Sequence, residues 1–513
     1  MELKTGEQIA INSFWNFLVV LFARLGGLFF IIIIARFLMP EGFGIYNLVI
    51  SLALIFLVTV DTGANRSLLR YVADAIGKKD YKLARANFNY LFKLKLYLTL
   101  SISIGLIILS YPLSFYLFKK PELFLPLIFT SLYILSYSFG SFYNTCFYII
   151  KKVNYVTIKE FLFEVARNLG VLLVFFLVAK EYYVIGTIGV LALTMFLAAL
   201  FLIYNLRKLS PFLFEKSDLT PDKKRIFRFF LYLGAIGSFL VIFGYVDTIM
   251  IGIFLDISYV GFYAAALTLT GSLWSFLNIS QILLPIFTQM KEHDLESAFN
   301  NVYKYLAILA IPAIFGIFVL GKPFIRAIYG PEYLPAVLPF YILSILILEV
   351  PLISIVESLF SAVEKPKYIM KIIIIATIMN IILNFVLIKS LLTISPEMAI
   401  IGAAMASLTS QTFYLFGLLF YAKRKLNINL KFAQTLKPII ASLGMILVLF
   451  SINHYVTLNI YYAIVEVFLG ASIYFILMFL IKGITKQDLN LLRSIKGDIT
   501  KNHKDSDKTS FSL

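Results

Sequence analysis

The chain has 513 residues, of which 60% are hydrophobic and only 14% are charged, and its formal net charge is +17. A soluble domain carries about 25% charged residues, so the composition excludes a water-soluble globular protein and indicates an integral membrane protein. The positive charge does not indicate nucleic-acid binding, because the basic residues gather in alternate short loops, as membrane topology requires.

Apolar segments long enough to cross a bilayer recur along the whole chain. At ~20 apolar residues per crossing, we expect about fourteen spans, near residues 14–36, 43–64, 87–109, 123–148, 156–178, 183–206, 229–253, 262–286, 302–320, 336–360, 368–388, 397–421, 437–454 and 460–481. The expected fold class is therefore an all-α integral membrane protein. The N-terminus lacks a short apolar stretch followed by a small-residue cleavage site, so we expect no removable signal peptide.

Lysine and arginine lie mainly in the loops on one side of the expected membrane. These basic loops fall at residues 66–85, 151–152, 207–228, 365–367 and 423–431, followed by the basic segment 482–508. Because positively charged loops stay in the cytoplasm, we expect a multi-pass protein of the cell membrane with both termini cytoplasmic. The last residues, 496–513, are polar and expected to be disordered.

The two halves of the sequence resemble each other. "RFLMPEGFGIY" at 36–46 aligns with "IFLDISYVGFY" at 253–263, and "KPELFLP" at 120–126 aligns with "GPEYLP" at 330–335, at an offset that stays near 210–217. Six spans per repeat is an even number, so the halves share one orientation. We expect a pseudo-two-fold axis along the membrane normal, a plan known from transporters, with the binding site between the halves.

The repeat divides the chain into five expected parts. They are an N-terminal lobe, a cytoplasmic linker, a C-terminal lobe, two additional spans and a cytoplasmic polar tail, at residues 1–206, 207–228, 229–421, 422–482 and 483–513. The sequence contains no visible channel filter loop. Its three histidines are scattered and Cys146 is the single cysteine. We therefore expect no disulfide, no metal site, no cofactor and no catalytic residue.

Arg24 lies in the middle of the first expected span, beside Gly26 and Gly27. A guanidinium at that depth costs at least ~3 kcal/mol on insertion-based scales. One interpretation is that Arg24 pairs with Glu164 or another acid and only fixes the packing. The other is a cationic site for an anionic ligand in a wet cavity, because guanidinium binds phosphate oxygens in pairs and keeps its proton.

Further charged residues lie within or beside the expected spans of the first half. They are Asp61, Arg66, Arg70, Lys93, Lys95, Glu160, Glu164 and Arg167. Spacings of four and three put the last three on one helix face, which should face the bundle because lipid would not tolerate it. The two lysines either line a cavity or snorkel to the headgroups. Arg66 and Arg70 either anchor the span or contact substrate, and the two glutamates either neutralise Arg167 or take up a coupling ion.

The second half has few charged residues within its spans. Asp247 is its main buried acid, and Asn380 and Asn384 are polar groups of a kind that more often joins helices than binds ligands. An exporter of organic cations requires acids in its cavity, whereas this chain gathers positive charge in one half. A substrate with an anionic head and a long apolar tail fits such a surface, because the tail remains in lipid.

Three stretches carry a family resemblance: "ARFLMPEGFGIYNLV" at 35–49, "DTGANRSLLRYVA" at 61–73 and "DTIMIGIFLDISYVGFYAAA" at 247–266. They resemble the polysaccharide transporter branch of the MOP (multidrug/oligosaccharidyl-lipid/polysaccharide) superfamily. This branch comprises O-antigen-type flippases related to MATE exporters and lipid II flippases. The resemblance implies two MATE-like six-helix lobes around a central cavity, plus two C-terminal helices. It also implies that Arg24 stands where lipid II flippases place a pyrophosphate-binding arginine.

We therefore predict a flippase that moves a polyprenyl-(pyro)phosphate-linked oligosaccharide to the outer face of the membrane by alternating access. The candidate substrate contacts are Arg24, Arg167, Lys93, Lys95, Asp61, Arg66 and Arg70, and the candidates for Na⁺ or H⁺ coupling are Glu160, Glu164 and Asp247. Expected partners are the lipid-linked substrate, membrane lipids, and glycosyltransferases or a polymerase of the same pathway, and no nucleic acid.

Two alternatives stay open at this point. One is a cation- or proton-coupled MATE-type exporter of small molecules, with which Asp247 is compatible. The other is a polytopic scaffold or a membrane glycosyltransferase. No Gly-x4-Gly-Lys-Ser/Thr phosphate-binding loop occurs in the sequence, so we do not expect ATP hydrolysis by the chain itself.

Overall fold

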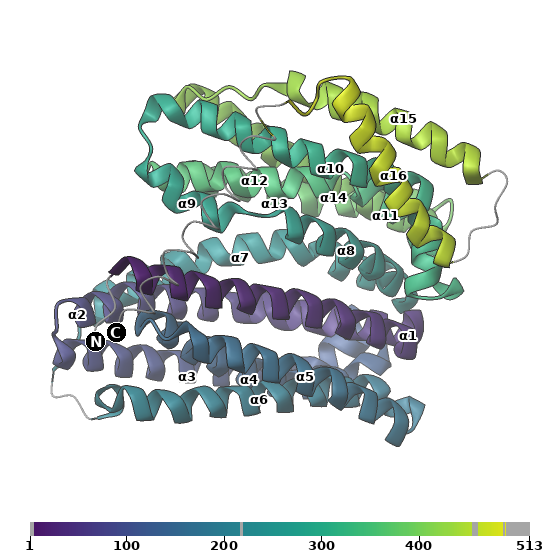
Figure 1. Cartoon of the computed structure of the whole chain (residues 1–513). Coiled ribbons are helices and arrows are strands. Elements are labelled where there is room, and N and C mark those ends of the chain that lie inside the picture. The colour runs from purple at the N-terminus through teal and green to yellow at the C-terminus, as the bar shows by residue number, and fades with distance from the viewer. Residues whose placement is uncertain (1–4, 216–218, 454–459, 486–487, 489–513) are drawn as a thin grey trace, which may run out of the picture.

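The computed structural model describes residues 5–215, 219–453, 460–485 and 488, and Figure 1 shows this part of the chain as a set of long helices joined by short connections. The helices are α1 (Thr5–Ser67), α2 (Ala73–Gly77), α3 (Tyr81–Pro112), α4 (Phe124–Ile149), α5 (Val153–Leu177), α6 (Tyr183–Leu209), α7 (Lys223–Phe254), α8 (Ile257–Leu277), α9 (Ser280–Gln289), α10 (Glu292–Ile328), α11 (Val337–Leu343), α12 (Leu346–Ala362), α13 (Lys367–Leu392), α14 (Pro396–Leu426), α15 (Leu436–Asn453) and α16 (Ile460–Leu480). Short π or 3-10 segments lie at Leu68–Val72, Leu113–Leu117, Pro121–Leu123, Lys180–Tyr182, Pro211–Phe214, Pro331–Ala336 and Phe432–Thr435.

The first two expected spans both lie in α1, because the chain reverses direction within it. Met39 has φ 58° and ψ 175°, outside the helical region, and the proline that follows lacks the N–H of a continuing helix. The Thr157 hydroxyl donates to the Trp15 carbonyl, while Gly63 packs against Phe230. Both ends of α1 therefore lie on the side of the membrane where α5 and α7 begin.

The described helices account for the fourteen expected spans. Ten are long and apolar enough to cross a membrane, and the pair α11–α12, bent by 47°, makes an eleventh span. The second half of α1 adds one more span. The remaining two are α5, whose apolar sequence is interrupted by charged residues, and α16, whose apolar stretch Val465–Leu480 is short.

The helices form two groups that lie side by side. In Figure 1, α1 and α3–α6 make up one group, α8–α16 the other, and α7 runs along the boundary. The helices α15 and α16 lie on the side of the second group that faces away from the first group. They pack on α10 through a small apolar core of their own that contains Ile308, Met445, Tyr474 and Met478.

Two helix ends show the internal repeat at the level of the backbone. Lys151 follows α4 and Glu364 follows α12, and both adopt the left-handed conformation, with φ of 59° and 56°. In each case the N–H of the next residue donates to a carbonyl five residues earlier, which defines a Schellman ending. These two positions align in the sequence repeat, so the two halves end matching spans in the same way.

The two groups touch through glycines that also align in the repeat, Gly44 of α1 and Gly261 of α8. A Cβ on Gly44 would overlap the carbonyl of Ile257, and a Cβ on Gly261 would overlap the carbonyl of Pro40. Helix backbones approach this closely only where the residues are small. We call this reciprocal contact of residues 40–44 with 257–261 the outer seam, because the loop charges predict that this end faces outward.

Polar contacts reinforce the outer seam. Arg36 donates from Nε to the Ile328 carbonyl at 2.7 Å and from Nη2 to the Ala327 carbonyl, so it binds the last carbonyls of α10. The Tyr333 hydroxyl donates to the Ala35 carbonyl at 2.7 Å. Cations at a helix C-terminus are stabilised by the carbonyls exposed there.

A second seam joins the last part of α1 to the first part of α7. The hydroxyls of Thr59 and Ser238 lie 2.5 Å apart. A Cβ on Gly234 would overlap the Thr59 carbonyl, and a Cβ on Gly63 would lie 2.7 Å from the Phe230 carbonyl. This contact, which we call the inner seam, holds the second half of α1 against α7 near the end of the bundle where α7 begins.

Candidate functional site

A pocket of about 330 Å³ separates the first half of α1 from the last part of α8. Its lining residues come from these two helices and are Arg24, Gly27, Leu28, Ile31, Thr268, Gly271, Ser272, Ser275 and Phe276. Residues 40–44, at the start of the second half of α1, meet the start of α8 at the outer seam, so the pocket lies between the two groups of helices on the inner side of that seam. We call it the interlobe pocket.

Arg24 is the charged residue of this pocket. Its guanidinium carbon lies 5.7 Å from the centre of the Phe276 ring, and none of the carboxylates that the structure describes forms an ion pair with it. The opposite wall carries the hydroxyls of Thr268, Ser272 and Ser275. A guanidinium with unused donors, beside hydroxyls and apolar walls, is suited to bind an anionic group.

The Gly26–Gly27 pair lets α5 place an ion pair against α1. Glu164 and Arg167 are one turn apart on α5 and form that pair. A Cβ on Gly26 would lie only 2.7 Å from the Glu164 Cβ, whereas a Cβ on Gly27 would meet Arg167 Nη2 at 3.9 Å, an ordinary contact distance. Glu164 is therefore the partner of Arg167 rather than of Arg24. Gly26, which has no side chain, allows α5 to pack closely against α1.

Arg167 lies directly behind the wall of the interlobe pocket. Its guanidinium carbon is 4.2 Å from the centre of the Phe30 ring and 5.0 Å from that of Phe163. Gly27, which lines the pocket, is its neighbour on α1. The Nε of Arg167 is buried without a hydrogen-bond partner in the described structure, so one strong donor remains unused.

The rest of the polar face of α5 is neutralised locally. Glu160 pairs with Lys159 at 2.5 Å, and Asn168 donates to the carbonyls of Gly26 and Glu164 at 3.2 and 2.8 Å. Lys159 and Asn168 are not among the residues predicted from the sequence. A signal for both exists in the sequence, because each is a polar residue within the span and adjacent to a predicted site residue, Glu160 or Arg167.

A second hollow, of about 420 Å³, lies between α1 and α5. Most of its lining is apolar, including the exposed Leu25, Phe29 and Phe161, and its polar members are Glu164 and Asn168. The first half of α1 thus has a pocket with a free guanidinium against α8 and an apolar groove against α5.

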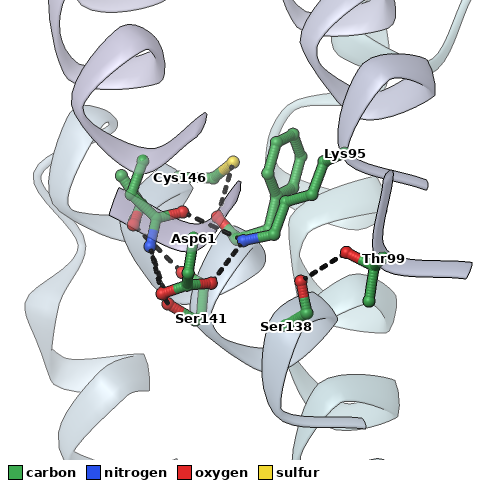
Figure 2. A network of polar contacts seen from close by, with 9 residues as sticks. Asp61, Lys95, Thr99, Ser138, Ser141 and Cys146 are labelled. Carbon is green, nitrogen blue, oxygen red and sulfur yellow. Dashed lines mark hydrogen bonds and ion pairs between the residues drawn. The ribbon is translucent and has the colours of Figure 1, made fainter. Parts of the chain in front are cut away.

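Figure 2 shows that Asp61 and Lys95 belong to a separate buried network. Lys95 Nζ lies 2.7 Å from Asp61 Oδ1 and 3.2 Å from the Asn65 side-chain oxygen. The other oxygen of Asp61 accepts from Ser141 at 2.9 Å. Lys95 is 0% exposed, so the charge of this predicted substrate contact is balanced inside the first lobe. Neither residue lines the interlobe pocket.

The other three predicted cations lie on the surface. Arg66, Arg70 and Lys93 are exposed, and Arg70 stacks on Phe229 with its guanidinium carbon 4.8 Å from the ring centre. None of the three lines the interlobe pocket. Their surroundings match those of residues that anchor helix ends near lipid headgroups.

Asp247 is buried in the second lobe. Its carboxylate accepts hydrogen bonds from Tyr263 at 2.8 Å, from Asn384 at 2.6 Å and from Ser407. No lysine or arginine of the described chain forms an ion pair with it. A carboxylate bonded by neutral donors alone can take up a proton or a cation. Of these partners, only Asn384 was predicted from the sequence as a polar residue at depth, and Tyr263 and Ser407 were not.

Nothing in the described residues forms a group of three or more His, Cys, Asp or Glu side chains placed to hold a metal ion. His293 is exposed beside Asp294. His454, His503 and the polar residues 496–513 lie outside the described residues.

The sequence is similar to known proteins of glycan synthesis. The profile of the family described as "Polysaccharide biosynthesis protein" matches residues 9–291. The probable low-salt glycan biosynthesis flippase Agl15 of Haloferax volcanii is 27% identical over 279 residues. That match covers 52% of this chain and 56% of the relative, so it spans little more than half the length of the relative.

Two solved structures share the fold. The lipid II flippase MurJ in an inward closed conformation superposes with a TM-score of 0.69 at 17% identity, covering 92% of this chain and 98% of that one. An inward-facing MATE family multidrug resistance transporter of the MOP superfamily superposes with a TM-score of 0.61 at 14% identity, covering 79% and 94%.

The two helical lobes, with Arg24 in the pocket between them, define a multi-pass membrane protein with the fold of the MOP superfamily. Within that class, the chain belongs to the polysaccharide biosynthesis protein family, whose profile matches more than half of its length. The fold class and the family resemblance predicted from the sequence are therefore confirmed.

Proposed function

We propose that the chain is a flippase that moves a polyprenyl-(pyro)phosphate-linked oligosaccharide from the cytoplasmic to the outer face of the cell membrane. The observation that carries this proposal is Arg24, a guanidinium at membrane depth in the interlobe pocket without a described carboxylate partner. An unpaired cation at that depth is costly, and an anionic headgroup in the pocket offsets the cost. The relative named as a glycan biosynthesis flippase supports the same activity.

The pocket offers complementary groups for the two polar parts of such a substrate. The planar guanidinium of Arg24 binds two phosphate oxygens at once. Ser272 and Ser275 donate their hydroxyl protons to backbone carbonyls at 2.9 and 2.8 Å, so their oxygens remain as acceptors for sugar hydroxyls. The isoprenoid tail stays in lipid, with the apolar groove between α1 and α5 as its nearest surface.

Transport then follows from rocking of the two lobes. The interlobe pocket lies between the first half of α1 and the last part of α8, and the outer seam closes the opposite end, so we infer that a headgroup enters the pocket from the inner side. Opening of the outer seam, together with closure of the inner ends of α1 and α8, exposes the same pocket to the outer face. Binding at a fixed site between two repeats is the general plan of such transporters.

Among the three predicted coupling residues, we favour Asp247 for a Na⁺ or H⁺. Glu160 and Glu164 already pair with Lys159 and Arg167, whereas Asp247 is bonded by neutral donors. Taking up a cation there neutralises a buried negative charge, which changes the relative free energies of the two lobe arrangements.

The second candidate function is a cation- or proton-coupled MATE-type exporter of small molecules, and Asp247 is the observation that favours it. An organic cation in the interlobe pocket would face Arg24 rather than an acid, which makes this function the less favourable. Neither candidate is an enzyme. We further propose that both termini are cytoplasmic and that the chain acts with glycosyltransferases or a polymerase of one pathway.

A flipping assay in proteoliposomes tests the proposal. The probe is a fluorescent polyprenyl-pyrophosphate-linked N-acetylglucosamine, and membrane-impermeant dithionite bleaches only the probe exposed outside. We expect the full chain to speed probe movement, and Arg24→Gln to slow it by about tenfold, the loss of ~1.4 kcal/mol of binding. Arg66→Gln, which removes the same charge from an exposed position of α1, should keep the full rate.

The assay also separates the two candidate functions. Equal rates for the full chain and Arg24→Gln would overturn the role of the pocket. Efflux of a cationic dye that needs Asp247 and is unaffected by Arg24→Gln would establish the exporter instead.

A further inference from the structure

A second charged hollow, far from the interlobe pocket, lies at the lysine-rich side of the membrane. It has a volume of about 400 Å³ and lies between the start of α10, the segment before α15 and the end of α16. Four lysines line it, Lys304, Lys431, Lys437 and Lys482, and no acid is among its lining residues. We call it the lysine pocket.

One of the four lysines is neutralised. Lys304 Nζ lies 2.7 Å from both carboxylate oxygens of Asp488, which also accept from Tyr305 and Thr485 at 2.8 Å. Although partial burial opposes ionisation, these donors hold the pKa of Asp488 well below its ordinary value. Asp488 is therefore ionised at neutral pH, and its ion pair with Lys304 ties Asp488 to α10.

The other three lysines keep their positive charge available. Lys437 Nζ donates to the Lys482 carbonyl at 2.8 Å, which uses one of its three N–H groups. That carbonyl is exposed because α16 ends in a Schellman motif, with Lys482 at φ 54° and Gly483 donating to the Met478 carbonyl at 2.8 Å. No described carboxylate forms an ion pair with Lys431, Lys437 or Lys482.

The surface beside the lysine pocket is apolar. Phe432 is 54% and Leu436 is 59% exposed, and the exposed side of α15 continues with Ile440, Leu443 and Leu447. Positive charge at the membrane surface that continues into an apolar helix face matches both ends of a phospholipid, the charged head and the acyl chains.

We infer that the lysine pocket binds the phosphate headgroup of an anionic phospholipid, whose chains lie along α15. Basic pockets between helices on the cytoplasmic side attract anionic headgroups, and the excess of positive charge here has no described counter-charge. Figure 1 places α15 and α16 on the far side of the second group of helices from α1, so this site is remote from the interlobe pocket. The bound lipid joins α15 and α16 to α10 and fixes these two helices against the lobe.

Native mass spectrometry of the purified full chain in detergent tests this inference, with added phosphatidylglycerol or phosphatidylcholine as the probe. We expect retained phosphatidylglycerol in preference to phosphatidylcholine. The triple variant Lys431→Gln, Lys437→Gln and Lys482→Gln should bind phosphatidylglycerol more weakly, by about fivefold for each lysine removed. Inorganic phosphate alone should not displace the lipid, because it lacks the chains.

A matched control removes the same charge from the same side of the membrane. Lys423→Gln, Arg424→Gln and Lys425→Gln change exposed residues at the end of α14, outside the pocket, and should leave lipid retention unchanged. Equal losses in both triple variants, equal retention of the two lipids, or displacement by inorganic phosphate would each overturn the inference.

If the triple variant does not fold, photo-crosslinking of the unmodified chain tests whether lipid binds in the lysine pocket. The unmodified chain is irradiated with a photoactivatable phosphatidylglycerol and digested. Labelled peptides from residues 431–443 and 478–485 support the site, and labelling confined to other segments overturns it.

Discussion

Arg24 differs from the other cations at membrane depth in what surrounds it. Lys95, Lys159 and Arg167 each form an ion pair with a carboxylate of the same lobe. Such pairs fix helices to one another, and the desolvation cost of each charge is offset by its partner. Arg24 has a ring and hydroxyls for neighbours instead, so its charge remains available to a ligand.

The pair of Lys95 with Asp61 should be structural. Lys95→Met removes the ammonium and leaves a partly buried carboxylate without compensation, which costs about 3–5 kcal/mol. We expect a clearly lower unfolding temperature for purified Lys95→Met, and partial recovery when Asp61→Asn is added. Lys93→Met, an exposed change on the same helix, is the control and should shift stability by less than about 0.5 kcal/mol. Equal effects of the two lysine changes would contradict the structural role.

Gly26 and Gly27 should respond differently to one added methyl group. Gly26→Ala places a Cβ 2.7 Å from the Cβ of Glu164 and still nearer to its carboxylate, so α5 must move or the ion pair must break. Gly27→Ala meets its neighbour at 3.9 Å and fits. We expect Gly26→Ala to lower the unfolding temperature and the flipping rate, while Gly27→Ala leaves the unfolding temperature unchanged. A stable and active Gly26→Ala would show that α1 and α5 are packed less closely than described.

At the scale of whole helices, α1 and α8 decide which side of the pocket is open. They touch through Gly44 and Gly261 at the outer seam and separate around Arg24. Each glycine faces a carbonyl at the start of the other span, because the two are related by the repeat. The contact between the two glycines depends on the absence of side chains, and opening the seam also breaks the hydrogen bonds of Arg36 and Tyr333.

Gly261→Ala should therefore open the outer seam. The added Cβ overlaps the Pro40 carbonyl, which favours the arrangement with the outer ends apart. In a chain with Cys146→Ser, a cysteine placed at Ser272 in the pocket should react faster with an impermeant maleimide added outside when Gly261→Ala is present. Gly244→Ala on α7, where an added Cβ meets no atom within 4 Å, should not change the labelling. Unchanged labelling with Gly261→Ala would mean that other contacts hold the seam.

The sequence predicts the spans and the repeat because hydropathy, loop charge and repeated motifs are properties of consecutive residues. The pairing of Glu164 with Arg167 also follows from their spacing on one helix. By contrast, the pairing of Asp61 with Lys95 and the absence of a described carboxylate partner for Arg24 depend on how each helix is rotated and on which helices touch. The rotation of a helix cannot be predicted from a pattern of consecutive residues. The domain boundaries at 206, 228, 421 and 482 stay predictions, because the structure gives helices rather than folding units.

For the whole molecule, the two seams predict where the lobes pivot. The outer seam must open for the pocket to face outward, whereas the inner seam between α1 and α7 is already closed and can stay closed throughout the cycle. The hydroxyls of Thr59 and Ser238 lie 2.5 Å apart across the inner seam, close to the ~2.0 Å of a disulfide. Oxidised Thr59→Cys/Ser238→Cys, in a chain with Cys146→Ser, should therefore flip the fluorescent probe at the rate of its reduced form. A rate that falls on oxidation and returns with reductant would show that the inner seam opens during transport, and that the lobes do not pivot about it.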